Sequence, residues 1–269
     1  MFPTVSVIIP TYNRRPMVEA AARSVLAQNY RDFELIVVDD GSTDGSATEL
    51  ARFGPQLRYF YQHRSGVSAA RNLGVCQSHG RLIAFLDSDD LWQPDKLGIQ
   101  VGFMEGSREV QICQTDEVWI RHGVRVNPKL KHRKPSGDIF ERSLDLCLVS
   151  PSAVMMTREL FDRSGGFDES LPVCEDYDLW LRIARDYPVP LIDQALVVKH
   201  GGHADQLSRS MWGMDRYQVM ALQKLLRAGI AGAQRSAVLR VLRNKLAVLA
   251  HGARKRDKVA EADGYQAML

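Results

Sequence analysis

Apolar runs and amphipathic segments alternate along the first ninety residues. Apolar and β-branched runs at 5–9 and 33–38 are typical of strands that are buried on both faces of a parallel sheet, and the segments 57–61 and 82–86 supply a short third strand and a fourth, apolar strand. Between them, the segments 16–29, 46–53 and 67–78 carry apolar or small residues close to helical spacing. Strands that alternate with helices in this way predict an α/β fold.

The pattern changes after residue 95. Apolar stretches at 110–120 and 149–156 flank a basic loop, RHGVRVNPKLKHRKPSGD, which is either solvated or turned toward an anionic acceptor. The spacing then predicts an amphipathic helix over 177–184 and a helical region from 214 to about 256. Cations are interleaved in this last region, so it is either an appendage with a solvated basic face or a basic surface for an anionic membrane or an acceptor-bearing partner.

The amino-acid composition excludes several classes of protein. A chain of 269 residues with 45% hydrophobic and 25% charged residues can bury a sizeable core, and its net charge of +3 is too small to indicate nucleic acid as a partner. The four cysteines form no CxxC pair, which favours reduced thiols over a zinc or disulfide framework. No stretch approaches ~18 uninterrupted apolar residues. We therefore expect a cytoplasmic protein, with any membrane contact peripheral, at the inner face and through the basic C-terminal helices.

Acidic clusters follow two of the predicted strands. The second strand leads into DDGSTDGS at 39–46, and the fourth leads into DSDD at 87–90. Such residues also cap helices and form turns, which would explain either cluster taken alone. Their joint occurrence indicates a ligand site at the carboxyl ends of the strands. The cluster at 87–90 exceeds what one cap requires, because neighbouring carboxylates repel one another unless a cation lies among them.

Five motifs in order carry a family resemblance. They are VSVIIPTYNR at 5–14, ELIVVDDGSTDGS at 34–46, GVSAARNLG at 66–74, FLDSDDLW at 85–92 and CEDYDLWLR at 174–182. Together they resemble the inverting glycosyltransferase family 2, over residues 4 to about 210. The resemblance implies the GT-A fold of nucleotide-diphospho-sugar transferases, a Rossmann-like mixed sheet flanked by helices. We expect a catalytic domain over 1–212, with a donor half at about 1–95 and an acceptor half at about 96–212, and a helical C-terminal appendage over 213–269.

The resemblance places the nucleotide-sugar donor on the first four motifs. Asp39 would accept a hydrogen bond from the base, whereas Asp40 is the alternative structural acid. Arg71 follows a helix start and would meet the phosphates, although an Arg on a solvated helix face is the simpler alternative. The other implied donor contacts are Pro10, Thr11, Tyr12, Asn13, Asp87, Ser88, Asp89 and Trp92.

A metal site is implied by Asp87-Ser88-Asp89, which matches the DXD signature of the fold. In that signature carboxylate oxygens hold Mn²⁺ or Mg²⁺ against the donor diphosphate, and hard cations prefer such ligands. Asp89 is the expected direct ligand, and Asp87 is expected to contact the ribose or the sugar. By resemblance, His203 or else His200 would also reach the metal or a phosphate, against the alternative of a plain structural role.

Catalysis is implied for the Glu175-Asp176 pair. Acidic residues in a first helical turn also complement the helix dipole, which is the structural alternative. In the family the Asp of this pair is the general base, so Asp176 would take the proton of the acceptor hydroxyl. Glu175 and Asp90 are expected at the acceptor or behind the residues that touch the substrates, and Asp90 could equally cap the segment that follows it.

The sequence therefore predicts a metal-dependent transferase of the hexosyltransferase type. It would move a sugar, most often from a UDP-sugar in this family, to a glycan or lipid-linked acceptor in cell-surface polysaccharide synthesis. A non-catalytic nucleotide-sugar binding module is the first alternative. A nucleotidyltransferase is the second, and the lack of glycines in PTYNRRP counts against it.

Overall fold

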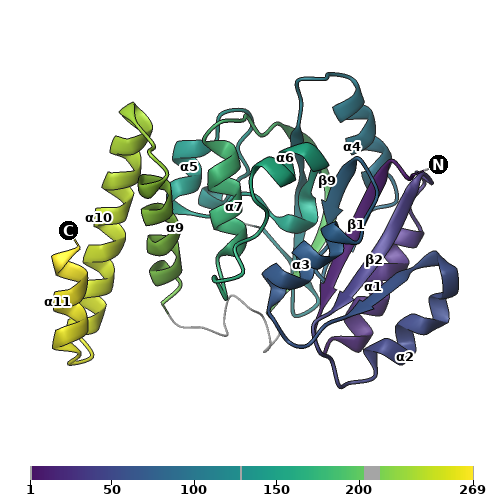
Figure 1. The fold of residues 1–269 in the computed structure, drawn as a ribbon, viewed down its shortest axis with the longest axis horizontal. Helices are drawn as coiled ribbons and strands as arrows, with labels where there is room; N and C mark the ends of the chain where they lie inside the picture. Colours follow the sequence, from purple (N-terminus) through teal and green to yellow (C-terminus); the bar gives the residue numbers. More distant parts are fainter. Residues whose placement is uncertain (1, 128, 203–212, 269) are drawn as a thin grey trace.

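The computed structural model describes residues 2–127, 129–202 and 213–268 (Figure 1). Its helices and strands, in chain order, are β1 (Val5–Thr11), α1 (Arg15–Leu26), β2 (Phe33–Asp39), α2 (Ser46–Leu50), β3 (Arg58–Tyr61), α3 (Val67–Cys76), β4 (Leu82–Phe85), β5 (Leu91–Trp92), α4 (Lys96–Glu105), β6 (Ile112–Arg121), β7 (Val124–Val126), α5 (Phe140–Asp145), β8 (Val154–Thr157), α6 (Arg158–Arg163), α7 (Glu175–Ala184), β9 (Leu191–Gly201), α9 (Asp215–Arg227), α10 (Gly232–Arg254) and α11 (Val259–Ala267). Short 3-10 helices lie at Ala51–Gln56, Leu130–His132 and Pro151–Ala153.

The N-terminal half of the sheet is parallel. Strands β3, β2, β1 and β4 lie side by side in that order, with all of their pairings parallel. On β1, Val7 and Ile9 enter an apolar cluster shared with α1 and α4, whereas Ile8 enters the cluster on the other face. The prediction that 5–9 and 33–38 form buried strands is therefore confirmed by β1 and β2, and β4 is buried as well, whereas β3 at the edge of the sheet is only partly buried.

The second half of the sheet is mixed. Strand β8 runs antiparallel to β4 and to β6, and β9 runs parallel to β6. Strands β6 and β8 arise from the apolar stretches that the sequence showed at 110–120 and 149–156. The expected basic loop is structured at its start, because β6 turns through His122 and Gly123 into β7 and forms a hairpin.

The helix expected over 46–53 is shorter than its pattern. Helix α2 ends at Leu50, and the chain continues as a 3-10 helix to Gln56. Gly54 has φ 55 and ψ −135 and is followed by Pro55, which has no backbone N–H to donate. These two residues stop the helix.

The C-terminal helices share the core of the sheet. Leu222 of α9 and Val238 of α10 belong to the same apolar cluster as Phe85 of β4 and Trp180 of α7. Figure 1 shows α9, α10 and α11 gathered at the end of the molecule away from β1 and β2. The domain division at residue 212 stays a prediction. Across the described ranges, every helix is too short or too polar to cross a membrane.

Close packing of α3 on β1 depends on Gly74. A β-carbon at this position would lie 2.4 Å from Ile8 Cγ2 and 3.3 Å from Val38 Cγ2. We expect Gly74→Ala to lower the free energy of unfolding by about 1–3 kcal/mol, because a packed core has no room for the added methyl group. Urea denaturation followed by circular dichroism measures the change.

Gly102→Ala is the matched control for this experiment. Gly102 also lies within a helix, α4, but nothing lies within 4 Å of a β-carbon built there. Helix propensity alone favours Ala over Gly by about 1 kcal/mol, so the control should gain stability. A Gly74→Ala protein that gains as much as the control would contradict the close approach of α3 to β1.

Candidate active site

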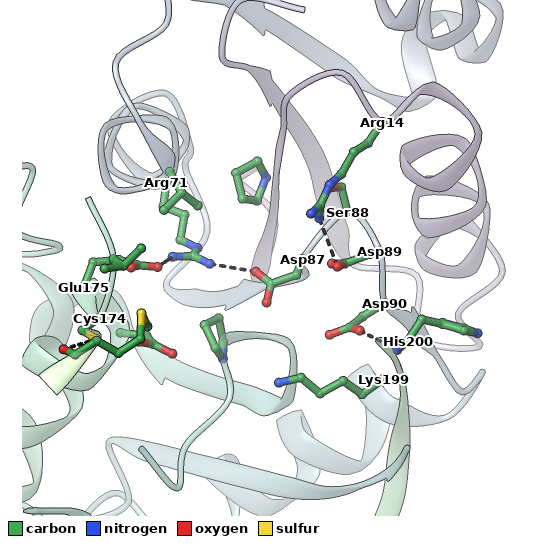
Figure 2. A pocket seen from close by; sticks show the side chains of 16 residues that line it. Arg14, Arg71, Asp87, Ser88, Asp89, Asp90, Cys174, Glu175, Lys199 and His200 are labelled. Atoms are coloured by element: carbon green, nitrogen blue, oxygen red, sulfur yellow. Dashed lines mark hydrogen bonds and ion pairs between the residues drawn. The ribbon is translucent and has the colours of Figure 1, made fainter. Parts of the chain in front are cut away.

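A cavity of about 230 Å³ lies at the carboxyl ends of β1 and β4, where they meet α3, α7 and β9 (Figure 2). Ligands of open α/β sheets bind at such a position, because strand ends, loops and helix amino termini converge there. The cavity brings together part of the predicted site, namely Pro10, Arg71, Asp87, Ser88, Asp89, Asp90, Glu175 and Asp176. Further lining residues that were not predicted include Arg14, Val67, Pro151, Cys174, Lys199 and Met214.

The loop after β4 carries its first two carboxylates to the cavity wall beside arginines. Arg71 Nη2 donates to Asp87 Oδ1 at 2.7 Å, and Arg14 Nη1 lies 3.0 Å from Asp89 Oδ2. Burial raises the pKa of Asp87, but Arg71 and Lys199 outweigh this effect and hold it below its usual range. Cations of the protein itself therefore offset the repulsion within this loop.

Asp90 is directed into the protein and is 1% exposed. Its Oδ2 accepts a hydrogen bond from Ser152 Oγ at 2.7 Å, and its Oδ1 accepts one from the backbone N–H of His200 at 3.0 Å. Burial, reinforced by Asp87 and Asp89, raises the pKa of Asp90 well above its usual range, although Lys199 opposes the shift. Asp90 joins the acidic loop to β9 and to the 3-10 turn that contains Ser152.

Arg71 joins the acidic loop to α7. Its side chain is 4% exposed, and its Nη1 donates to Glu175 Oε1 at 2.7 Å while Nη2 binds Asp87. The guanidinium lies 4.9 Å from the ring centroid of Phe167. Burial lowers the pKa of Arg71, but the two carboxylates outweigh it and raise the pKa above its usual value. The alternative of an Arg on a solvated helix face is therefore wrong.

Helix α7 begins inside the cavity with Glu175 and Asp176. The residue before it, Cys174, has φ 63 and ψ 19, a left-handed conformation that residues with a β-carbon seldom adopt. Burial and the neighbouring Asp176 raise the pKa of Glu175 to about 7, although Arg71 opposes the shift. Asp176 is half-buried, and its Oδ2 accepts a hydrogen bond from the thiol of Cys147 at 3.5 Å.

Lys199 reaches the cavity from β9 and was missed by sequence reasoning. Its Nζ donates to Ser150 Oγ at 3.1 Å, and Figure 2 shows the amine directed into the same space as Asp87. Burial lowers the pKa of Lys199, but nearby carboxylates, with Glu117 and Asp90 the strongest, outweigh it and raise the pKa. The available signal was a lysine directly after the apolar run of 196–198, because a charge in a buried strand normally has a partner.

The loops after β1 and β2 hold each other next to the cavity. The backbone N–H of Asn13 donates to Ser42 Oγ at 2.8 Å, and that of Thr43 donates to Asn13 Oδ1 at 2.8 Å. Asp39 is fully buried and accepts hydrogen bonds from the backbone of Ser42 at 2.7 Å and from the Tyr59 hydroxyl at 2.8 Å. The predicted residues that lie at these strand ends and loops and do not line the cavity itself are Thr11, Tyr12, Asn13 and Asp39.

Asp40 has a structural role, as its alternative interpretation proposed. Its Oδ1 accepts hydrogen bonds from Gln62 Nε2 at 2.6 Å and from the backbone of Ser65 at 2.7 Å. Its Oδ2 accepts one from the backbone N–H of Gly66 at 2.9 Å. Asp40 thereby fixes the loop that leads into α3, the helix that carries Arg71.

Three further predicted residues remain. Trp92 is 5% exposed, and its Nε1 donates to the Ser152 carbonyl at 2.8 Å, so it supports the acidic loop from behind. His200 lines the cavity, but Figure 2 shows its side chain directed away from Asp87 and Lys199. His203 lies outside the described residues.

The oxygen ligands for a metal ion are few. Within the described part of the chain, no three His, Cys, Asp or Glu side chains are grouped so as to hold a metal ion. Mg²⁺, however, commonly takes only one or two carboxylates when substrate phosphates complete its shell. Asp87 and Asp89 offer carboxylates of this kind at the cavity wall. They suit a divalent cation that is bound together with a phosphate ligand.

The chain is similar in sequence to known glycosyltransferases. A family model described as Glycosyl transferase family 2 matches residues 6–165. An uncharacterized glycosyltransferase of Rickettsia felis is 36% identical over 200 residues, which are 71% of this chain and 32% of the relative. The Escherichia coli enzyme WfgD, a UDP-Glc:alpha-D-GlcNAc-diphosphoundecaprenol beta-1,3-glucosyltransferase, is 31% identical over 70% of this chain and 73% of its own. The chain spans about a third of the length of the first of these relatives.

Two solved structures share the fold. TarS of S. aureus (residues 1–349), in complex with UDP-GlcNAc, has a TM-score of 0.76 at 20% identity, over 91% of this chain and 73% of TarS. The mannosyltransferase PcManGT of Pyrobaculum calidifontis, in complex with GDP-Man and Mn²⁺, has a TM-score of 0.68 at 20% identity, over 100% of this chain and 75% of its own. The predicted GT-A fold is confirmed.

The Arg71 bridge should dominate the stability of the site. In Arg71→Met, the buried Glu175 and the half-buried Asp87 lose their shared cation, and removing one partner from a buried ion pair such as Arg71–Glu175 costs about 3–5 kcal/mol. Without the cation, the pKa values of both carboxyls rise above those of the unfolded chain, so the folded variant binds more protons and becomes relatively less stable as pH increases. We expect the deficit in unfolding free energy to be larger at pH 8 than at pH 5.5.

Urea denaturation of the variant and the wild type at both pH values measures this difference. Arg81→Met is the control, because Arg81 pairs with Glu105 at the surface, where their side chains are 56% and 51% exposed. Such exposed pairs contribute about 0–1 kcal/mol. A deficit for Arg71→Met no larger than the control, or one that grows as pH falls, would refute the buried bridge.

Proposed function

Because the chain belongs to glycosyltransferase family 2, we propose that it transfers a sugar from a nucleotide-diphosphate donor to an acceptor hydroxyl, with inversion at the anomeric carbon. One observation carries the proposal: a single cavity is lined by both Asp87-Ser88-Asp89 and Glu175-Asp176. A transferase needs the two motifs close together, because the leaving group and the attacking hydroxyl act on the same carbon atom.

The donor nucleotide is proposed to lie over the paired loops after β1 and β2. Pro10, Thr11, Tyr12 and Asn13 would line it. Asp39 is fully buried beneath these loops, so its contact with the base would require Ser42 or Tyr59 to give way. For the diphosphate, Arg14, Arg71 and Lys199 supply positive charge along the cavity wall.

A divalent ion is proposed to complete the donor site. Mn²⁺ or Mg²⁺ would be held by Asp89, with Asp87 beside it and the diphosphate oxygens as further ligands. When bound, such an ion stabilises the negative charge of the departing nucleoside diphosphate. PcManGT, whose structure contains GDP-Man and Mn²⁺, supports this choice of ion.

Asp176 is proposed as the general base. It lies in the first turn of α7 at the cavity wall, and the Cys147 thiol donates to its Oδ2. The carboxylate would take the proton of the acceptor hydroxyl while that oxygen attacks the anomeric carbon opposite the leaving nucleotide. A single displacement of this kind forms no covalent sugar intermediate and inverts the centre.

The acceptor is proposed to be a glycan or a lipid-linked saccharide in cell-surface polysaccharide synthesis. WfgD, by its name, uses UDP-Glc and a diphosphoundecaprenol-linked sugar, and TarS binds UDP-GlcNAc. These relatives favour a UDP-sugar as donor, and a location in the cytoplasm stays a prediction. A non-catalytic nucleotide-sugar binding module of the same fold is the alternative that the next two experiments test.

Calorimetric titration with UDP, GDP and dTDP, each with Mn²⁺ and with chelator, tests the donor site. We expect metal-dependent binding of one nucleotide, UDP above all. Asp89→Asn should weaken it at least tenfold because a metal ligand is lost, while Asp193→Asn, on an exposed part of β9, should leave it unchanged. If none of the three nucleotides binds in either metal condition, the donor-site assignment fails.

Asp176→Asn separates catalysis from binding. Removing a general base typically costs about 10²–10⁴-fold in rate, so release of nucleotide from the donor during transfer should fall by that factor. Nucleotide affinity should remain that of the wild type, because Asp176 is assigned to the acceptor side. Turnover within about threefold of the wild type would remove Asp176 from the mechanism, and the absence of turnover in the wild type with any acceptor would favour the binding module.

A further inference from the structure

On the described surface, a concentration of positive charge without acidic neighbours lies around the β6–β7 hairpin. No Asp or Glu occurs between Glu117 and Asp138. Five exposed cations occupy this stretch, namely Arg121, Arg125, Lys129, Lys131 and Arg133. Among the described residues, none of these five is paired with a carboxylate. We call them, with Val124 and Leu130, the hairpin surface.

Apolar side chains protrude between these cations. Leu130 is 88% exposed and Val124 is 65% exposed, the former being the most exposed large hydrophobic residue of the described chain. A single exposed apolar side chain needs no explanation, but here two of them lie within a segment that also carries five exposed cations. Cations interleaved with protruding apolar side chains are instead the composition that binds anionic lipid bilayers, where headgroups meet the cations and the acyl boundary receives the apolar groups.

The hairpin surface is linked to the cavity through the pairing of β6 with β9. Trp119 pairs in register with Lys199 across β6 and β9, and its Nε1 donates to Glu117 Oε1 at 2.8 Å. Glu117 in turn forms a buried ion pair of 2.9 Å with Lys134, and the His132 ring lies against Trp119 with 5.4 Å between ring centroids. These contacts lock the 3-10 turn that carries Leu130 onto the strands that deliver Lys199 to the cavity.

We propose that the hairpin surface docks on an anionic lipid bilayer and thereby holds the cavity at the membrane interface. The docking does not depend on the transferase activity proposed above. If that activity is correct, the arrangement brings a lipid-linked acceptor to the Lys199 side of the cavity.

The basic C-terminal helices are the competing surface. Helix α10 exposes Arg240 and Arg243, and Lys255 is exposed just beyond its end. Within the described ranges these three cations also have no carboxylate partner. Acidic residues return nearby, however, at Asp257, Glu261 and Asp263. Figure 1 shows α10 at the end of the molecule farthest from β1 and β2, whereas the hairpin surface adjoins a cavity-lining strand.

Co-sedimentation with vesicles of 30% phosphatidylglycerol in phosphatidylcholine tests the proposal, with pure phosphatidylcholine vesicles beside them. The full chain should bind the anionic vesicles and lose affinity as salt increases. Each cation near an anionic surface is worth roughly a fivefold change in partitioning. The triple variant Arg125→Gln, Lys129→Gln, Lys131→Gln should therefore bind roughly 100-fold more weakly.

The triple variant Arg240→Gln, Arg243→Gln, Lys255→Gln is the matched control, since it removes three positive charges from α10 and the residue that follows it. It should lose less than about fivefold. A second hairpin variant, Leu130→Ser, keeps every charge and should weaken binding roughly tenfold with an unchanged salt dependence, because an inserted apolar side chain is lost.

Three results would overturn the proposal: no binding of the wild type to anionic vesicles, equal losses in the two triple variants, or a larger loss in the α10 variant. Calorimetric titration of the hairpin variants with UDP is run in parallel. Unchanged nucleotide binding together with lost vesicle binding assigns the defect to the hairpin surface. Vesicle binding in a protein that binds no nucleotide would uphold the docking and refute the proposed donor site.

Discussion

Carboxylates from two distant segments of the chain meet at the cavity. Their negative charges repel one another, so the site is stable only where positive groups neutralise them. Asp87, Asp89 and Asp90 follow β4, while Glu175 and Asp176 open α7. The balancing groups arrive on other elements: Arg14 at the start of α1, Arg71 on α3 and Lys199 on β9. Each of these elements is fixed by its packing on the sheet, so the electrostatic balance and the architecture depend on each other.

Helix α7 connects the site to the C-terminal helices. Its Asp178, with a side chain 1% exposed, is paired with Arg182 one turn later at 2.9 Å and with Lys224 of α9 at 2.8 Å. Tyr177 and Trp180 on the same helix lie in the apolar cluster that also contains residues of α9 and α10. The orientation of Glu175 and Asp176 therefore rests on helices that follow them by forty residues or more.

Local patterns predicted much of this arrangement. Strands buried on both faces, the acidic loop at 87–90 and the start of α7 all have signals within a few residues, and they were predicted correctly. Partners that depend on the tertiary fold left no such signal. Arg14 and Lys199 meet the acidic loop only because β1 and β9 end beside it, and nothing near Asp90 in the sequence indicates its bond to the backbone of His200. Asp39 looked like a free acceptor for a base, yet the fold buries it against Ser42 and Tyr59.

The sheet order also determines when the site can form during synthesis on the ribosome. Strand β9 lies between β6 and β5, yet it is the last strand of the described chain to be made, more than a hundred residues after the acidic loop. At a translation rate of about 5–20 residues per second, the loop emerges on the order of ten seconds before Lys199 and the backbone partner of Asp90. During that interval only Arg14 and Arg71 are available to neutralise the acidic loop. A nascent chain interrupted before β9 therefore leaves this loop exposed to water on the side that β9 later covers.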